Sequence, residues 1–597
     1  MNGHQQGAGG PPDPGAEKRV LLAFVLTFLV IALMQPLVSR YARQQQPAPA
    51  PQEPAKPATP PPPQPQQPAP PAAKATRTPK AMRTPAAPVT AKQSAAEAET
   101  VVENDLYRIV FTNRGALVKS WVLKKYNDDK GKPLELVHTL AAGQHGYPLS
   151  LWPYDLALRQ KVNSVLYVPS TQGALSVPGQ LTFEYADGQM VVRKVLSFDH
   201  SYVVHVETSL AENGSAVQAY PAWPAGFGDQ TTPASYGAAH VVWEYRDKLE
   251  RVEPKKVSGG NTLSGPFQWA GVTDQYFAAV FLPDEPESAA MITLHSPVNI
   301  PKNADQPGST ETVEVHVLGA AVGNRQGPTR TRLFVGPKAV EVLDAIHAAP
   351  AGGAAPDLAG LVDFGKWFGW LARPLFLWLK WTHEHWVRNW GWAIMVLTVI
   401  INVALFPLRL TQMKSALKMQ KAQPQLKAIQ EKYKKYPMRD PRRQDMNKEM
   451  QELYKREGIN PAGGCLPLVL QMPFLIAFYS MLGVTIELRH ATWLWIRDLS
   501  APDPWHLLPI AIMISMFYLQ RLTPAAGMDP MQQKMMTVMM PVMIGALSWT
   551  LASGLGLYWT MGNVIAIVQQ HLVNRSQFGR EMRAEMEKRA AKKKAKS

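Results

Sequence analysis

Asn402 is a strongly polar side chain inside the apolar run from Trp390 to Leu408. A polar group within a membrane span is a functional candidate by default, and an amide could hydrate a cavity or hydrogen-bond a polypeptide backbone. On a helix, Thr398 lies one turn before Asn402 on the same face. Arg409 follows seven residues after Asn402, about 10 Å along the axis at 1.5 Å per residue. On this spacing we hypothesise that Arg409 reaches back along the same face of the helix; the favoured alternative is that its guanidinium extends to lipid phosphates.

Enzymatic and metal chemistry leave no recognisable pattern in the sequence. Cys465 is the single cysteine, which excludes an intramolecular disulfide and a Cys cluster for a metal ion. Gly360, Gly365 and Lys366 imitate a phosphate-binding loop, but Trp367 stands where Ser or Thr should hold magnesium. No stretch matches the zinc-binding pattern HExxH. We therefore expect no enzyme activity, no catalytic residue, no cofactor and no metal site.

Apolar segments punctuated by Pro and Gly must position the polar side chains. Five of them are Trp390–Leu408, Cys465–Val484, Trp505–Leu522, Met535–Ala552 and Leu555–Leu572. A sixth, at 20–38, follows two basic residues and is long enough to cross a bilayer. We interpret it as an uncleaved signal-anchor rather than a cleaved signal peptide, because the run is long and no small-x-small site follows. The prediction is an α-helical polytopic membrane protein with six spans.

Two clusters of basic residues predict the orientation of the spans. Residues 409–460 hold 14 Lys and Arg against 6 Asp and Glu, and residues 573–597 hold 9 against 3. Cytoplasmic loops carry such an excess, and four spans between the clusters keep both on one side. We therefore expect a cytoplasmic N-terminus at 1–19, a cytoplasmic helical hairpin at 409–460 and a cytoplasmic tail at 573–597. Nucleic-acid binding is the alternative explanation of this charge.

The chain between the first and second spans divides into three parts. Residues 39–99 form a Pro-rich linker that cannot bury enough apolar surface to fold. Residues 100–345 show period-two alternation, as at 313–317, with turn residues between the runs. This pattern predicts a large all-β sandwich domain, which the orientation of the spans places outside the cytoplasm. From 360 to 388, tryptophans are interspersed with Lys and Arg, which is typical of an amphipathic helix in the membrane interface.

Tyr220, Trp223 and Phe227 form an aromatic-rich stretch of the β domain. Such a stretch could bind a sugar or a peptide. The sequence favours the alternative, in which these rings pack in the core or against a loop.

Several ordered motifs then carry a family resemblance. In the apolar part they are Asn389-Trp390-Gly391-Trp392, Phe406-Pro407-Leu408, Asn460-Pro461-Ala462-Gly463-Gly464-Cys465-Leu466-Pro467, Gln471-Met472-Pro473-Phe474, Asp529-Pro530-Met531-Gln532-Gln533-Lys534 and Ser553-Gly554-Leu555. In the β domain they are Trp269-Ala270-Gly271-Val272-Thr273-Asp274-Gln275-Tyr276-Phe277 and Phe334-Val335-Gly336-Pro337-Lys338. With the order of the parts, they resemble the YidC membrane protein insertases of Gram-negative bacteria. The resemblance covers about residues 15–40 and 100–580.

The resemblance implies a five-helix insertase core at 389–572 that works without ATP. Its helices would form a hydrophilic groove, open to the cytoplasm and to lipid but closed outside. A polar segment of the client would enter the groove while its apolar helix slides out, which divides one large desolvation barrier into smaller steps. The family's usual groove arginine aligns with Asn402, and an amide cannot attract an acidic tail. Arg409 is our candidate for the substitute cation.

The residues that we expect in the groove or in contact with clients are polar or aromatic positions of the spans. They are Asn402, Thr398, Arg409, Gln471, Gln520, Tyr558, Trp559 and Asn563. Further polar candidates are Tyr479, Ser480, Thr550, Ser553, Thr560 and Gln569. Helix–helix packing is nearly as good an explanation for any one of them.

The resemblance also implies partners and a location. The protein would insert and help fold nascent membrane proteins in the cell inner membrane, alone or with the Sec translocon. The basic tail and hairpin would contact the ribosome or anionic lipids. Two other functions stay open from the residues alone: a secondary transporter, although we find no internal repeat, and a membrane-anchored ligand-binding protein.

Overall fold

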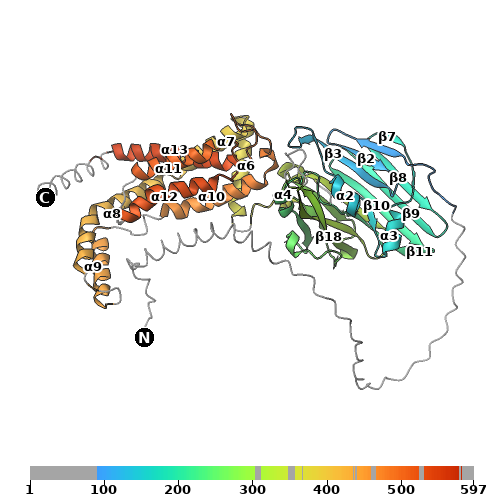
Figure 1. Ribbon diagram of the computed structural model, residues 1–597, viewed down its shortest axis with the longest axis horizontal. Helices are drawn as coiled ribbons and strands as arrows, with labels where there is room; N and C mark the ends of the chain where they lie inside the picture. The colour runs from blue at the N-terminus through green and yellow to red at the C-terminus, as the bar shows by residue number, and fades with distance from the viewer. Residues whose placement is uncertain are drawn as a thin grey trace, which may run out of the picture.

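The computed structural model describes residues 90–302, 311–346, 357–365, 368–433, 436, 440–458, 466–522, 530–576 and 580. The predicted N-terminus at 1–19 and the signal-anchor at 20–38 lie outside these residues, as do most of the linker and most of the tail. A β part and a helical part lie end to end along the long axis (Figure 1).

Three sheets make up the described β part. The ten-stranded sheet has the order β14-β13-β16-β17-β20-β10-β9-β8-β6, with β11 beside β10; its strands are β6 (Val168–Pro169), β8 (Gly179–Ala186), β9 (Met190–Phe198), β10 (Val203–Glu212), β11 (Ser215–Val217), β13 (His240–Tyr245), β14 (Lys248–Val252), β16 (Trp269–Thr273), β17 (Phe277–Pro283) and β20 (Thr329–Pro337). The sheet β4-β3-β2-β1-β7 contains β1 (Glu99–Glu103), β2 (Tyr107–Thr112), β3 (Leu117–Asn127), β4 (Pro133–Glu135) and β7 (Gly173–Leu175). The sheet β15-β18-β19-β12-β5 contains β5 (Ser150–Trp152), β12 (Tyr220–Trp223), β15 (Thr262–Ser264), β18 (Ala289–Pro301) and β19 (Thr312–Asn324). Four short helices accompany them: α2 (Thr139–His145), α3 (Leu156–Val162), α4 (Pro233–Gly237) and α5 (Val340–Asp344).

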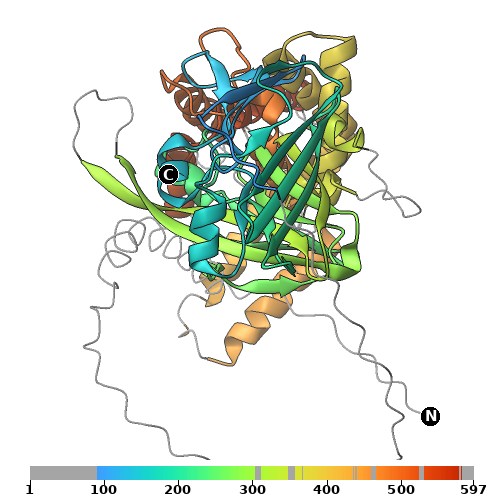
Figure 2. The same cartoon turned by 90° about the vertical axis from the view of Figure 1, so that its right-hand side faces the viewer.

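The alternation of apolar and polar residues that predicted this domain matches the alternation of buried and exposed residues along its strands. In β10, Val204 and Val206 are buried, whereas His205 between them is exposed. β10 pairs antiparallel with both β9 and β20, so its buried residues join those of its neighbours in one apolar layer. Figure 2 shows the strands of this part stacked in layers. The predicted β sandwich is confirmed.

The aromatic-rich stretch of the β domain belongs to its core. Tyr220, Trp223 and Phe227 are all buried. The ring of Trp223 lies 5.9 Å from that of Trp121 and 5.5 Å from that of Phe227, between centroids. Of the two interpretations, packing is therefore the correct one.

Lys194 on β9 is a fully buried lysine held by backbone oxygens. Its Nζ donates to the carbonyl oxygens of Gly115, Ala116 and Leu149 at 2.9, 3.0 and 2.8 Å. Ala116 and Leu149 have positive φ angles of 51° and 64°, a backbone conformation that is uncommon outside glycine. Lys194 thus joins two turns to the ten-stranded sheet, and burial lowers its pKa to about 7.

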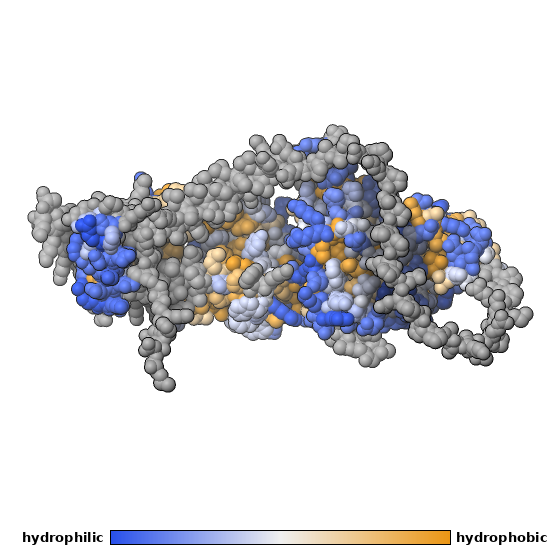
Figure 3. Space-filling view, turned by 90° about the horizontal axis from the view of Figure 1, so that it is seen from below, coloured by the Kyte–Doolittle hydropathy of each residue, from blue (hydrophilic) through white to orange (hydrophobic). Residues whose placement is uncertain are grey.

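Eight helices make up the described helical part: α6 (Gly369–His385), α7 (Trp390–Ala404), α8 (Phe406–Tyr433), α9 (Arg442–Arg456), α10 (Leu466–Val484), α11 (Leu507–Leu522), α12 (Pro530–Ser548) and α13 (Ser553–Arg575). α13 packs against α7 and α11, α11 against α12, and α6 against α7 and α10. α8 and α9 form the predicted hairpin at the far end of the molecule (Figure 1). The surface is hydrophilic at the hairpin end and has hydrophobic areas over the part of the helical bundle between the hairpin and the β part (Figure 3).

Among the described residues, no single helix combines the length and the apolarity that crossing a membrane requires. The pair α6 and α7 meets that test together but bends by 120° where the two helices join. Shorter apolar helices span Met472–Val484, Leu507–Leu522 and Lys534–Ser548. The number of six spans therefore stays a prediction.

Two predicted boundaries differ from the structure. The first core segment does not run as one helix to Leu408, because α7 ends at Ala404 and α8 begins at Phe406. Pro407 has no N–H to continue the hydrogen-bond ladder across this junction. In the described part of the amphipathic segment predicted at 360–388, the α-helix runs from Gly369 to His385, and a short 3-10 turn at Ala359–Leu361 precedes it.

Candidate functional site

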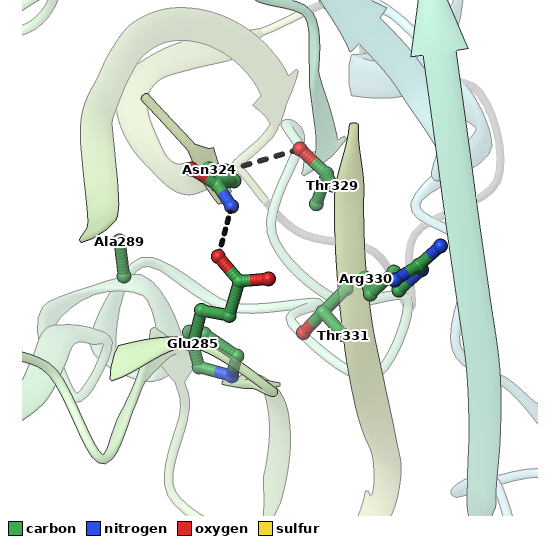
Figure 4. A pocket seen from close by; sticks show the side chains of 8 residues that line it. Glu285, Ala289, Asn324, Thr329, Arg330 and Thr331 are labelled. Atoms are coloured by element: carbon green, nitrogen blue, oxygen red, sulfur yellow. Dashed lines mark hydrogen bonds between the residues drawn. The ribbon is translucent and has the colours of Figure 1, made fainter. Parts of the chain in front are cut away.

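Two hollows in the β part lie away from every predicted site residue. One has a volume of only about 10 Å³, the space of a single water; there Asn324 Nδ2 donates to Glu285 Oε2 at 2.7 Å (Figure 4). The other, of about 290 Å³, is lined by Trp152, Arg159 and His295 among others. The candidate site is built instead from helices α7, α8 and α13.

Thr398 and Asn402 lie on the buried face of α7. Thr398 Oγ1 donates to Ile394 O at 2.7 Å, and Asn402 Nδ2 donates to Thr398 O at 2.8 Å. Asn402 is only 2% exposed, and its Oδ1 has no hydrogen-bond partner among the described residues. An unpaired buried acceptor costs about 1–3 kcal/mol. A water or a polypeptide N–H would therefore bind favourably at this oxygen.

Arg409 and Asn402 meet through one side chain of α13. Arg409 Nη1 donates to Gln569 Oε1 at 3.0 Å, and Gln569 Nε2 donates to the backbone oxygen of Asn402 at 3.3 Å. The carbonyls of a helix's last turn lack partners within the helix, so the end of α7 at Ala404 leaves this oxygen available. The structure thus places Arg409 one side chain away from Asn402.

Two more predicted residues join α13 to other helices. Tyr558 is buried and stacks on Phe478 of α10, with ring centroids 4.1 Å apart. Asn563 Nδ2 donates to Ser515 Oγ of α11 at 2.9 Å. We did not predict Ser515; the signal that could have found it is a lone serine in the apolar stretch Leu507–Phe517 of this helix. Both contacts lie within the bundle, and they fix α13 against two neighbours.

The remaining predicted residues have less specific surroundings. Trp559 and Gln520 are half-buried, and the side chain of Gln471 lies outside the described residues. Ser553, one of the further candidates, has a structural role, because its N and Oγ both donate to Ala501 O at 2.7 Å.

The loop between α10 and α11 covers one end of the bundle. The carboxylate of Asp503 accepts from the backbone N–H of Leu508 in the first turn of α11 at 2.7 Å and from that of Trp505, just before α11, at 3.1 Å. It also accepts from Trp495 Nε1 at 3.0 Å. Gly391 of α7 lies against the ring of Trp493, where an added Cβ would be only 2.3 Å away. Only glycine permits this close approach. The loop is therefore packed onto the helices over the end opposite to the hairpin (Figure 1).

The same loop contacts the β part. Arg489 and His490 both face Asp129, at 3.5 and 3.2 Å. Gln275, in the turn between β16 and β17, donates to the carbonyl oxygen of Gly483 at the end of α10, at 2.8 Å. These bonds hold the β part against the end of the helices that lies furthest from Arg409.

Comparison with known proteins decides the family. Residues 99–378 match the family model described as the YidC periplasmic domain, and residues 381–580 match the model described as 60Kd inner membrane protein. A membrane protein insertase YidC from Syntrophus aciditrophicus (strain SB) is 30% identical over 585 residues, which cover 94% of this chain and 99% of the relative. The chain belongs to the YidC family. Another YidC relative, from Geobacter sulfurreducens, is 33% identical over 79% of this chain and 85% of its own.

Membership of the YidC family confirms the resemblance seen in the sequence motifs. A crystal structure described as an active YidC insertase with its first transmembrane domain resolved covers 81% of this chain and 94% of its own, at 20% identity and a TM-score of 0.34. As a YidC protein the chain is an inner membrane protein with a periplasmic β domain and a helical C-terminal region. The YidC family is not a family of enzymes.

Proposed function

We propose that this protein inserts newly made proteins into the inner membrane through a hydrophilic groove, and that Thr398, Asn402 and Arg409 contact the client there. Its curated relatives carry the name membrane protein insertase. The observation that supports the assignment of the site is the buried Oδ1 of Asn402, which has no partner in the described part of the chain and lies beside the bridge from Gln569 to Arg409.

Physically, the site would lower the barrier for moving a polar segment into the bilayer. An unpaired backbone group in hydrocarbon costs several kilocalories per mole. Asn402 Oδ1 can accept from a client N–H, and Arg409 can donate to a client carboxylate or carbonyl. Each contact replaces part of the lost hydration, so the segment enters in small steps. Gln520, Tyr558, Trp559, Asn563 and Gln471 would extend the contact surface along the bundle.

The topology and partners belong to the same proposal. The signal-anchor at 20–38 and the five core segments would give six spans, with both termini in the cytoplasm. The amphipathic helix α6 would lie in the membrane interface, where Trp370 and Trp378 expose their rings. The basic hairpin and tail would contact the ribosome or anionic lipid, and the protein would act alone or beside the Sec translocon.

Insertion by the purified protein tests the function directly. In proteoliposomes, we expect the wild type to insert a short single-span client, measured by protease protection. Asn402→Leu should reduce insertion about tenfold, because it removes a hydrogen-bond acceptor worth about 1–1.5 kcal/mol. Asn402→Arg should retain insertion, since it keeps the position polar.

Thermal unfolding in detergent is the control for these variants. If Asn402→Leu folds like the wild type and inserts the client equally well, Asn402 does not contact the client. If the wild type inserts nothing beyond protein-free liposomes, the proposed function is wrong for this client.

A further inference from the structure

Gln569 occupies a position that joins the two candidate contact residues. Its Nε2 donates to the backbone oxygen of Asn402 at 3.3 Å, and its Oε1 accepts from Arg409 Nη1 at 3.0 Å. Gln569 is itself only 6% exposed. Its side chain therefore reaches the ends of two other helices, α7 and α8, from α13.

The chemistry of these two hydrogen bonds restricts which side chain can bridge Asn402 and Arg409 at position 569. A backbone carbonyl only accepts and a guanidinium only donates, so the bridging side chain must donate at one end and accept at the other. A primary amide does both and carries no charge. A carboxylate of the same shape could accept from Arg409, but it would repel the carbonyl of Asn402 and neutralise the guanidinium. Gln569 thus holds Arg409 in place without cancelling its charge.

We propose that Gln569 is a positioning residue that sets the charge preference of the site. This inference rests on the proposed function. By holding the guanidinium of Arg409 beside Asn402, Gln569 makes the site favour clients whose leading polar segment carries carboxylates. A fixed guanidinium loses less side-chain entropy when it binds a carboxylate than a free one does.

The experiment compares two clients that differ only in their leading segment, one with Asp residues and the other with Asn at the same positions. The full-length protein in proteoliposomes is tested as wild type, Gln569→Glu and Gln569→Ala. Gln570→Glu is the matched control, because Gln570 is the next residue of α13, is equally buried and bonds instead to Asn574 Oδ1 at 3.0 Å. The readout is the ratio of acidic-client to neutral-client insertion.

We expect Gln569→Glu to lower this ratio about tenfold and Gln569→Ala to lower it by a smaller factor. Gln570→Glu should keep the wild-type ratio. Raising the salt concentration should lower the ratio of the wild type more than that of Gln569→Glu, because salt screens the attraction that the wild type retains.

Two results would overturn the inference. One is a wild-type ratio of acidic-client to neutral-client insertion in Gln569→Glu. This includes the case in which insertion of both clients falls by the same factor, which is the result expected if Gln569 has only a structural role. The other is an equal fall of the ratio in Gln570→Glu. Failure of the wild type to insert either client is a different outcome, because it refutes the proposed function itself.

Discussion

Arg409→Ala should reduce insertion of a client with an acidic leading segment about 10- to 100-fold. The loss corresponds to one hydrogen bond to a charged group, about 1.5–3 kcal/mol, at 1.4 kcal/mol for each factor of ten. In the proposed site Asn402 can donate and accept but cannot attract a carboxylate. The proposal therefore assigns that attraction to Arg409, which Gln569 joins to Asn402. The measurement is protease protection of the acidic client relative to its neutral counterpart in proteoliposomes.

Two further variants make this result interpretable. Arg409→Lys keeps the charge but loses the planar donor geometry, so we expect an intermediate effect. Lys427→Ala removes an exposed cation from the same helix, α8, and serves as the control for a general loss of positive charge. Insertion of the acidic client by Arg409→Ala at the wild-type level would mean that the guanidinium serves lipid phosphates instead.

Lys194→Met should destabilise the β domain by about 3–5 kcal/mol. The substitution keeps most of the apolar stem but leaves three buried carbonyl oxygens, those of Gly115, Ala116 and Leu149, without their donor. Each unpaired buried acceptor costs about 1–3 kcal/mol. Hydrogen exchange of the β9 amides in the full-length protein measures the effect locally. Exchange as slow as in the wild type would show that the two turns hold without the ammonium group.

Stability of the same domain should rise with pH through the range in which Lys194 titrates. Its pKa in the fold is about 7, whereas an unfolded lysine has a pKa of about 10.4. Between these values the unfolded chain binds the proton and the folded chain does not, so the free energy of unfolding increases with pH. The neutral folded amine keeps two of the three N–H donors of the ammonium group. Hydrogen exchange, corrected for its intrinsic pH dependence, should show this rise from pH 7 to 9 in the wild type. Lys194→Met has no group to titrate here, so an equal rise in that variant would contradict the assignment.

The sequence alone was enough to predict the protein family and to predict that a β domain is followed by a helical part. Period-two alternation predicted the β sandwich because burial of one strand face forces apolar residues to every second position; β10, with Val204 and Val206 buried around an exposed His205, shows this directly. Motifs such as Asn389-Trp390-Gly391-Trp392 were sufficient to recognise the YidC family, because each motif is a short run of consecutive residues that can be read without knowing the fold. Asn402 stood out since a polar residue in an apolar run is visible without any fold.

The tertiary structure decided which polar groups meet. Gln569 lies more than 150 residues from Asn402 and Arg409 in the chain, and the sequence offered it only as one of several polar candidates. The break between α7 and α8 at Leu405 was not predicted from the sequence. It leaves the backbone carbonyl of Asn402 available to accept a hydrogen bond from Gln569. Lys194 gave no sequence signal at all, because a lysine on a strand ordinarily points to solvent. A linear pattern records which face of an element is buried, but the partner of a buried polar group depends on how distant elements pack, and only the folded chain determines that.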